Sequence, residues 1–148
     1  MCDLDNCHIA ADLTHDLIRR NIATQATMDR FRKKKFSWPA RATCIHMVRF
    51  HLVKMGHKPP ALPEMRSLLA AHRALALRGW ADVAEMMGTI LPEIAPAEML
   101  MGDIALLQSD DVIGALAIEI GGTIIGWHDD ARGMVVMRAL KIERAWRA

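Results

Sequence analysis

A change in residue patterning at Gly102 constrains the fold of this chain more than any other sequence feature. Before Gly102, apolar residues recur at helical spacing. After it come four short apolar runs of strand length, and Gly121-Gly122 separates the second run from the third, which predicts a β-hairpin. Helices followed by antiparallel strands predict an α+β domain. The predicted strands cover residues 104–107, 116–120, 123–127 and 134–137.

The first part of the chain contains several predicted helices with breaks between them. Ile9, Leu13 and Leu17 recur at every fourth residue and indicate a short helix, which we expect to end near Asn21. The proline-containing segment 57–63 cannot be helical in its interior and is predicted to be a linker. The other predicted helices cover residues 24–34, 44–55, 63–77 and 80–87.

Cys44 stands where a polar, proline-containing loop meets an apolar helix. A cysteine at a helix N-terminus is close to unpaired backbone N–H groups and to the positive end of the helix dipole, which favour the thiolate. Cys44 is therefore a candidate nucleophile. The alternative is that Cys44 is the first core residue of its helix, because free cysteines are often buried. The buried stripe of this helix is predicted to contain Met47, Val48, His51, Leu52 and Met55.

Composition narrows the classes of protein that the chain can represent. A formal charge of +2 is too small to indicate a nucleic-acid partner, and the short basic cluster 30–35 is typical of a solvated helix end. Three cysteines form no disulfide framework, which fits synthesis in a reducing cytoplasm. We see no signal peptide and no apolar run long enough to span a membrane. No cofactor is expected, and the soft ligands Cys2, Cys7 and His8 are too few for a metal site.

Several segments together resemble the papain-like peptidoglycan endopeptidases of the NlpC type. Segment 36–44 resembles the loop that leads to the nucleophile in that family, and Gly102-Asp103-Ile104 resembles the turn that opens its sheet. Segment 115–121 resembles the strand that carries the catalytic base, and Gly126-Trp127-His128 resembles the element after it. The resemblance spans about residues 24–148 and implies N-terminal helices packed on a small C-terminal antiparallel sheet, with Cys44 as the nucleophile.

The chain looks closest to small NlpC-like proteins encoded in the tail modules of phages, prophages and gene-transfer agents. In those proteins a Phe-x-Trp loop and a terminal Ala-Trp-Arg recur, and here they correspond to residues 36–38 and 145–147. The expected organisation is an N-terminal extension, residues 1–22, followed by an NlpC-like domain, residues 23–148. Phage tail-tip or hub proteins are the partners that the resemblance implies.

The position of the catalytic base departs from the resembled family. It falls on Ala115, which cannot accept a proton, and the residue before the candidate nucleophile is Thr43 where an acidic residue is usual. A cysteine peptidase needs an imidazole within about 3 Å of its sulfur. His46 points to another face of the Cys44 helix, and His51 lies about 10 Å further along its axis.

His128 is the best candidate for a displaced base, because it is predicted at a strand end near the catalytic half of the resemblance. The alternative is that His128 is a turn histidine capped by Asp129 or Asp130. Asp110 and Asp111 could orient a histidine, but successive turn carboxylates are more typical of a solvated turn.

These observations leave three functions open. The first is a structural phage-tail protein with a degenerate peptidase fold, made in the host cytoplasm and carried in the virion. The second is an active peptidoglycan endopeptidase that uses Cys44 and His128 to cut a stem-peptide amide during cell-wall penetration. The third is a helical binding protein without a connection to phage. Neither a nucleic-acid partner nor membrane insertion is expected for any of them.

Overall fold

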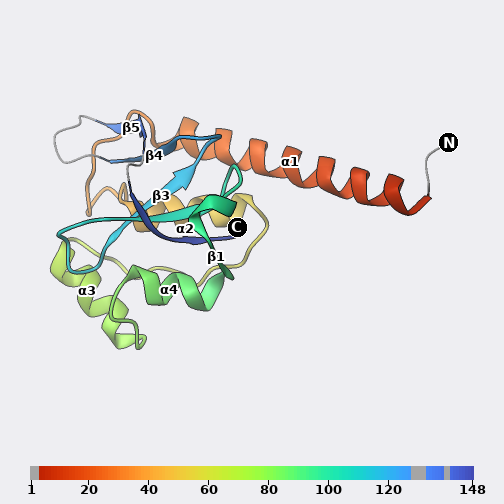
Figure 1. Ribbon diagram of the computed structural model, residues 1–148. Helices are drawn as coiled ribbons and strands as arrows, with labels where there is room; N and C mark the ends of the chain where they lie inside the picture. The colour runs from red at the N-terminus through yellow and green to blue at the C-terminus, as the bar shows by residue number, and fades with distance from the viewer. Residues whose placement is uncertain (1–3, 128–132, 139–140) are drawn as a thin grey trace.

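The computed structural model describes residues 4–127, 133–138 and 141–148, with side chains from residue 11 onward. Within these ranges, helices precede an antiparallel sheet, so the predicted α+β class is confirmed (Figure 1). The helices are α1 (Leu4–Phe31), α2 (Cys44–Lys54), α3 (Leu68–Leu77), α4 (Val83–Ile90) and a 3-10 turn, η1 (Pro96–Glu98). The strands are β1 (Glu93–Ile94), β2 (Ile104–Leu107), β3 (Ala115–Glu119), β4 (Ile124–Trp127), β5 (Met134–Met137) and β6 (Ile142–Trp146).

The sheet has the strand order β1-β6-β2-β3-β4-β5, and every recorded pair is antiparallel. The predicted hairpin at Gly121-Gly122 is confirmed, since β3 pairs with β4 in antiparallel register across this turn, where both glycines have positive φ. The carboxylate of Glu119 accepts hydrogen bonds from the backbone N–H groups of both glycines and fixes the turn. Strands β1 and β6 were missed because neither is an apolar run: β1 is two residues long, and β6 contains Glu143 and Arg144.

Helix α1 is continuous from Leu4 to Phe31, so the expected break at Asn21 is wrong. Asparagine has only a modest helix penalty, of roughly half a kcal/mol. The stripe that includes Arg20, Thr24 and Thr27 is buried against the domain and keeps the helical period through this point. The N-terminal half of α1 projects away from the rest of the molecule (Figure 1). The expected boundary between residues 22 and 23 lies inside this helix, and the division into extension and domain stays a prediction.

Helices α3 and α4 begin later than expected, because each begins directly after a polar residue that caps its first turn. The side chain of Ser67 accepts a hydrogen bond from the N–H of Ala70 at the start of α3, and Asp82 accepts one from Glu85 at the start of α4. The expected starts near residues 63 and 80 are therefore wrong. Gly88 lies inside α4 rather than after it.

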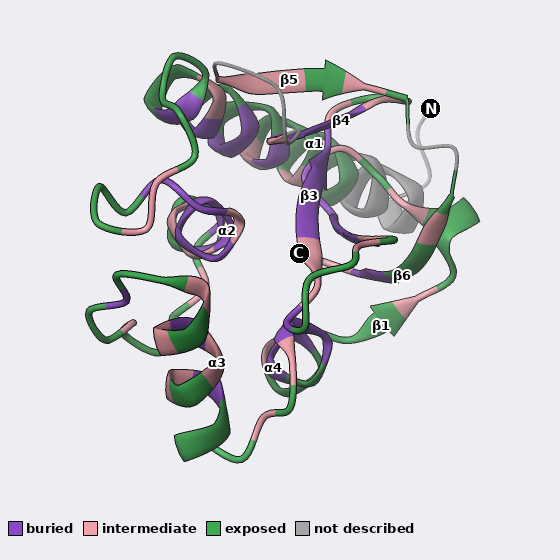
Figure 2. Cartoon of the chain, turned by 90° about the vertical axis from the view of Figure 1, so that its left-hand side faces the viewer, coloured by how far each residue is buried: buried purple, intermediate pink, exposed green. Residues whose placement is uncertain are grey.

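The core lies between the helices and the sheet (Figure 2). Helix α2 packs against α1 and β3, and α4 packs against β6. The predicted inward stripe of α2 is confirmed, because Met47, Val48, His51, Leu52 and Met55 are all buried. None of the helices described is both long and apolar enough to cross a membrane.

Candidate functional site

The start of α2 places Cys44 at the end of a tight loop. The backbones of Ser37 and Ala42 pair across this loop through two hydrogen bonds, and Arg41 adopts a positive φ of 57°. Thr43 caps the helix with its side chain, which accepts from the N–H of His46. The loop thus turns the chain sharply, so that Cys44 is the first helical residue, as the sequence predicts.

Cys44 keeps part of its surface exposed, but protein atoms surround its thiol closely enough to desolvate it. Burial raises the pKa of the Cys44 thiol above its usual range, and the negative charge of Asp111 acts in the same direction. Backbone hydrogen bonds from Leu116 and Ile45 oppose this effect but do not outweigh it. The expected stabilisation of a thiolate at the helix N-terminus is therefore smaller than the desolvation cost.

Ala115 begins β3, next to Leu116, whose backbone N–H lies close enough to the Cys44 thiol to lower its pKa. The tertiary structure thus brings the start of α2 and the start of β3 together, although Leu116 comes 72 positions after Cys44 in the sequence. The methyl group of Ala115 can neither accept nor donate a proton. Within the part of the chain that the structure describes, no imidazole hydrogen-bonds the Cys44 sulfur.

The two histidines of α2 have other partners. His46 Nδ1 lies 2.8 Å from Thr43 Oγ1, and burial together with the charges of Arg41 and Arg49 lowers the pKa of His46 to about 4. His51 Nε2 lies 2.8 Å from the carbonyl oxygen of Gly102, and its Nδ1 lies 3.1 Å from Thr27 Oγ1. Burial also lowers the pKa of His51. Both side chains are therefore neutral structural groups at neutral pH.

The remaining candidate residues divide into two groups. His128, Asp129 and Asp130 lie outside the described residues, as do the side chains of Cys2, Cys7 and His8. The roles expected for these residues stay predictions. Asp110 and Asp111 are described and lie exposed in a turn.

Comparison with known proteins places the chain in a family. The family described as "Domain of unknown function (DUF6950)" matches residues 18–148. The chain belongs to the DUF6950 family. No curated protein matches it. Among solved structures it is similar to the crystal structure of the NlpC/p60 domain of the peptidoglycan hydrolase SagA, with a TM-score of 0.57 and 12% identity. That match covers 86% of this chain and 98% of the other, and confirms the papain-like NlpC/p60 fold.

Asp103 of this DUF6950 chain is a structural residue that the sequence did not reveal. Its carboxylate is fully buried and forms ion pairs with Arg20 of α1, at 2.7 Å, and with Arg147, at 3.1 Å. It also accepts hydrogen bonds from the N–H groups of Leu100 and Ala148. Asp103 therefore connects α1, the turn before β2 and the residues that follow β6.

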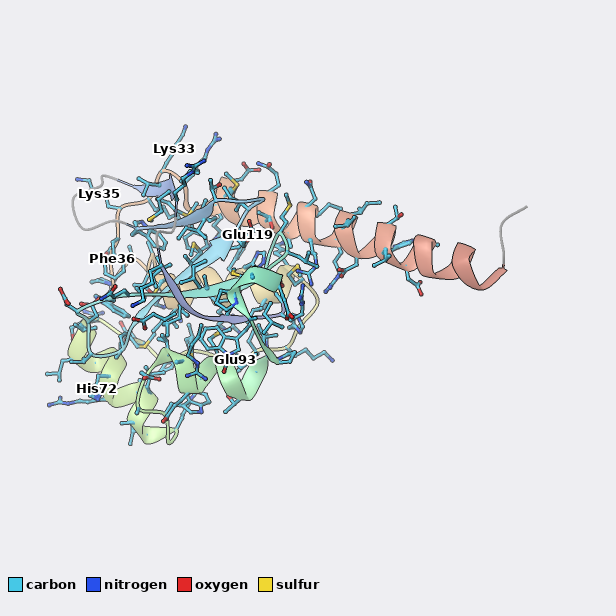
Figure 3. The ribbon with its side chains drawn as sticks, viewed as in Figure 1. Lys33, Lys35, Phe36, His72, Glu93 and Glu119 are labelled. Carbon is cyan, nitrogen blue, oxygen red and sulfur yellow. The ribbon has the colours of Figure 1, made fainter. Side chains whose placement is uncertain are left out.

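Aromatic side chains connect the loop before Cys44 with the end of β4. The ring of Phe36 lies 5.6 Å from Trp38 and 5.9 Å from Trp127, both in edge-to-face geometry. Trp127 Nε1 donates a hydrogen bond of 2.9 Å to the carbonyl oxygen of Lys34. Lys33, Lys35 and Phe36 lie at the end of the molecule where β5 is found (Figure 3). The side chains of residues 32–35 are exposed, so this basic segment borders the aromatic group.

Proposed function

We propose that this protein is a structural component of a phage tail tip that retains an NlpC/p60-like peptidase fold without peptidase activity. It is made in the host cytoplasm and carried in the virion, where it binds tail-tip or hub proteins. Its descent from a peptidoglycan hydrolase accounts for the position of Cys44 at the start of α2.

The observation that carries the proposal is the environment of Cys44. Burial raises the pKa of the thiol. The sequence resemblance aligns Ala115, the first residue of β3, with the position of the family's base. Amide hydrolysis by a thiol needs an imidazole that forms the thiolate and then protonates the leaving amine. Cys44 lies at the start of α2, where the resembled family carries its nucleophile. Among the described residues, no imidazole forms a hydrogen bond with its sulfur.

The assignment to a tail rests on the motifs around residues 36–38 and 145–147, which resemble those of tail-module proteins. Eleven methionines are compatible with burial against partner chains, since methionine adapts to irregular surfaces. A tail would also deliver the protein to the cell envelope.

Two measurements test the proposal. The first incubates the purified protein and its Cys44→Ala variant with peptidoglycan sacculi and analyses released peptides by mass spectrometry, with an active NlpC/p60 enzyme as the positive control. We expect no released stem-peptide fragments from either. Fragments that appear with the parent protein and vanish with Cys44→Ala would overturn the structural function and support the active endopeptidase, with His128 as its base.

The second measurement tests the tail assignment separately. Antibodies against the chain are used to probe purified phage-like particles from the encoding strain, together with tail-less fractions. We expect the protein in stoichiometric amounts in tails. Its absence from particles, with the protein present only in the soluble fraction, would remove the tail assignment and favour the generic binding protein.

A further inference from the structure

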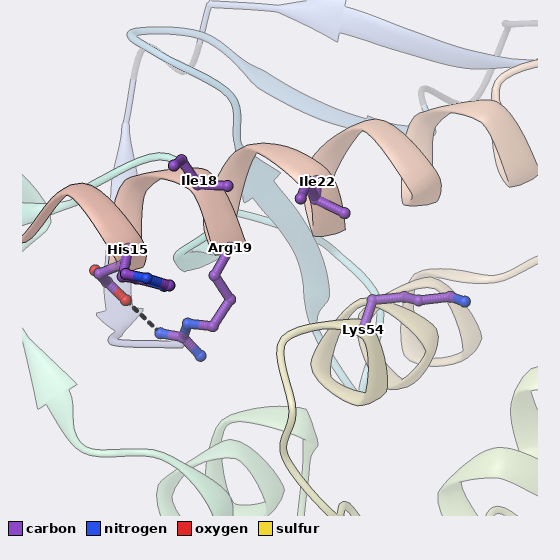
Figure 4. A pocket seen from close by; sticks show the side chains of 6 residues that line it. His15, Ile18, Arg19, Ile22 and Lys54 are labelled. Atoms are coloured by element: carbon purple, nitrogen blue, oxygen red, sulfur yellow. Dashed lines mark hydrogen bonds and ion pairs between the residues drawn. The ribbon is translucent and has the colours of Figure 1, made fainter. Parts of the chain in front are cut away.

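An open groove lies between α1 and the C-terminal end of α2 (Figure 4). It measures about 560 Å³. Ile18 and Ile22 of α1 are 52% and 63% exposed, and because they lie one helical turn apart they form a single exposed apolar patch beside the groove. The groove is lined by His15, Asp16, Ile18, Arg19, Ile22 and Lys54.

Charge is divided unequally along the helix that forms this groove. Within α1, residues 4–17 contain three aspartates and neither lysine nor arginine, whereas residues 18–31 contain three arginines and one aspartate. Two copies of α1 in antiparallel arrangement would place the acidic half of each beside the basic half of the other. A parallel arrangement would place like charges together. Charge complementarity therefore favours an antiparallel pair.

The face of α1 that borders the groove has the spacing of a helix-pairing seam. Ala11, His15, Ile18 and Ile22 follow one another at intervals of four, three and four residues, which places them on one side of a helix. The seam is exposed along its length, because all four residues are exposed. It carries two small or polar positions in its N-terminal half and two isoleucines in its C-terminal half.

We propose that this face binds a second copy of the chain, with the two α1 helices antiparallel about a two-fold axis. In this register Ala11 of one copy lies opposite Ile22 of the other, and His15 lies opposite Ile18. The exposed carboxylate of Asp12 then faces the Arg19 and Lys54 side chains that border the groove of the second copy. Each groove is thereby filled by the other copy's helix. The pairing does not depend on the proposed function.

Leu13 and Leu17 provide an internal control. They are 60% and 57% exposed, on the same helix and in the same stretch of residues, but they lie on another face and do not line the groove. Their replacement therefore changes the hydrophobicity of α1 to the same extent without touching the proposed seam.

The first test measures molar mass by sedimentation equilibrium over a range of concentrations. We expect the full chain to form a dimer of roughly 33 kDa, twice the 16.5 kDa of one chain. Ile18→Glu/Ile22→Glu should weaken the dimer by at least tenfold, and Leu13→Glu/Leu17→Glu should not. Circular dichroism checks that both variants are folded. A monomer at all concentrations, or equal loss in both variants, would overturn the proposal.

The second test examines the register by charge exchange. Asp12→Lys and Lys54→Glu should each weaken the dimer, and the double variant should restore it, because the two groups face each other across the axis. Additive loss in the double variant would contradict this arrangement.

The third test examines the register by cross-linking, in a chain whose native cysteines are replaced by serine. Ala11→Cys/Ile22→Cys should form disulfide-linked dimers on oxidation. The two positions are about 16 Å apart within one helix, so they cannot bridge in the same chain. Leu13→Cys/Ile22→Cys is the matched control and should cross-link poorly. Cross-linking of equal yield in both would contradict the proposed seam.

Discussion

Replacement of Asp103 tests whether the buried carboxylate holds α1 and the end of β6 to the sheet. Asp103 is fully buried, and Arg20, which it pairs at 2.7 Å, is 2% exposed. Asp103→Ala leaves the guanidinium of Arg20 buried with only Asp16 as an acidic partner. It also leaves the N–H groups of Leu100 and Ala148 without their acceptor.

The magnitude follows from the cost of breaking a buried ion pair. Removal of one partner of a buried ion pair costs about 3–5 kcal/mol. Asp16 still pairs with Arg20 after the replacement, but two N–H groups also lose their acceptor, so this range is kept. For a chain of this size each kcal/mol lowers Tm by roughly 3 °C, so we expect Asp103→Ala to lower Tm by about 9–15 °C. Asp103→Asn keeps one acceptor oxygen and should fall between Asp103→Ala and the parent protein.

Thermal and urea unfolding followed by circular dichroism measure these changes. Glu64→Ala is the control, since Glu64 pairs with Arg66 at 2.8 Å through a side chain that is 75% exposed. Exposed pairs contribute little, so this control should leave Tm unchanged. If Asp103→Ala lowered Tm no more than Glu64→Ala, the structural role that we assign to Asp103 would be refuted.

Three further predictions concern the Cys44 thiol, the His46 side chain and two glycines. The raised thiol pKa predicts that Cys44 reacts slowly with iodoacetamide at pH 7, with a rate that still increases above pH 8.5; fast labelling near pH 6 would show an activated thiolate. His46 has a pKa of about 4 in the folded chain against 6.5 when free, so its stabilising effect is complete above pH 6.5 and declines as the pH falls toward 4. His46→Gln should remove up to about 3 kcal/mol of that pH dependence, measured by urea unfolding across this range, and an unchanged slope would contradict it. Gly102→Ala should destabilise the fold by at least about 1 kcal/mol, because the φ of Gly102 is +90°. Gly88→Ala should instead stabilise the fold by up to about 1 kcal/mol, because Gly88 lies in a helix with open space around it. Equal shifts in Tm for the two variants would contradict both expectations.

Local signals in the sequence were enough to predict much of the fold. The periodic apolar residues after Cys44 predicted α2, and its end near Gly56 is confirmed, since Met55 caps the helix and Gly56 has a positive φ. The paired glycines 121 and 122 predicted the hairpin between β3 and β4. Each of these features depends on residues close together in the chain, and their backbone preferences do not need a distant partner.

Features that depend on distant contacts were predicted less well. The break expected at Asn21 is absent because residues far along the chain bury the inner face of α1. Strand β6 was missed because its pairing with β1 and β2, rather than its own composition, makes it a strand. The role of Asp103 could not be predicted, since it depends on Arg20 and Arg147, which lie far from it in sequence.

The sequence by itself determined the class of the fold and the position of Cys44 at the start of a helix, because both depend on periodicity and local turns. Only the tertiary structure decided the chemical state of that cysteine. Its thiol lies against the backbone of Leu116 on β3, and the cost of desolvating a thiolate there exceeds the benefit of the helix N-terminus. Local sequence thus predicts the position of a candidate nucleophile in the fold, whereas burial by residues distant in sequence decides whether its thiol is ionised.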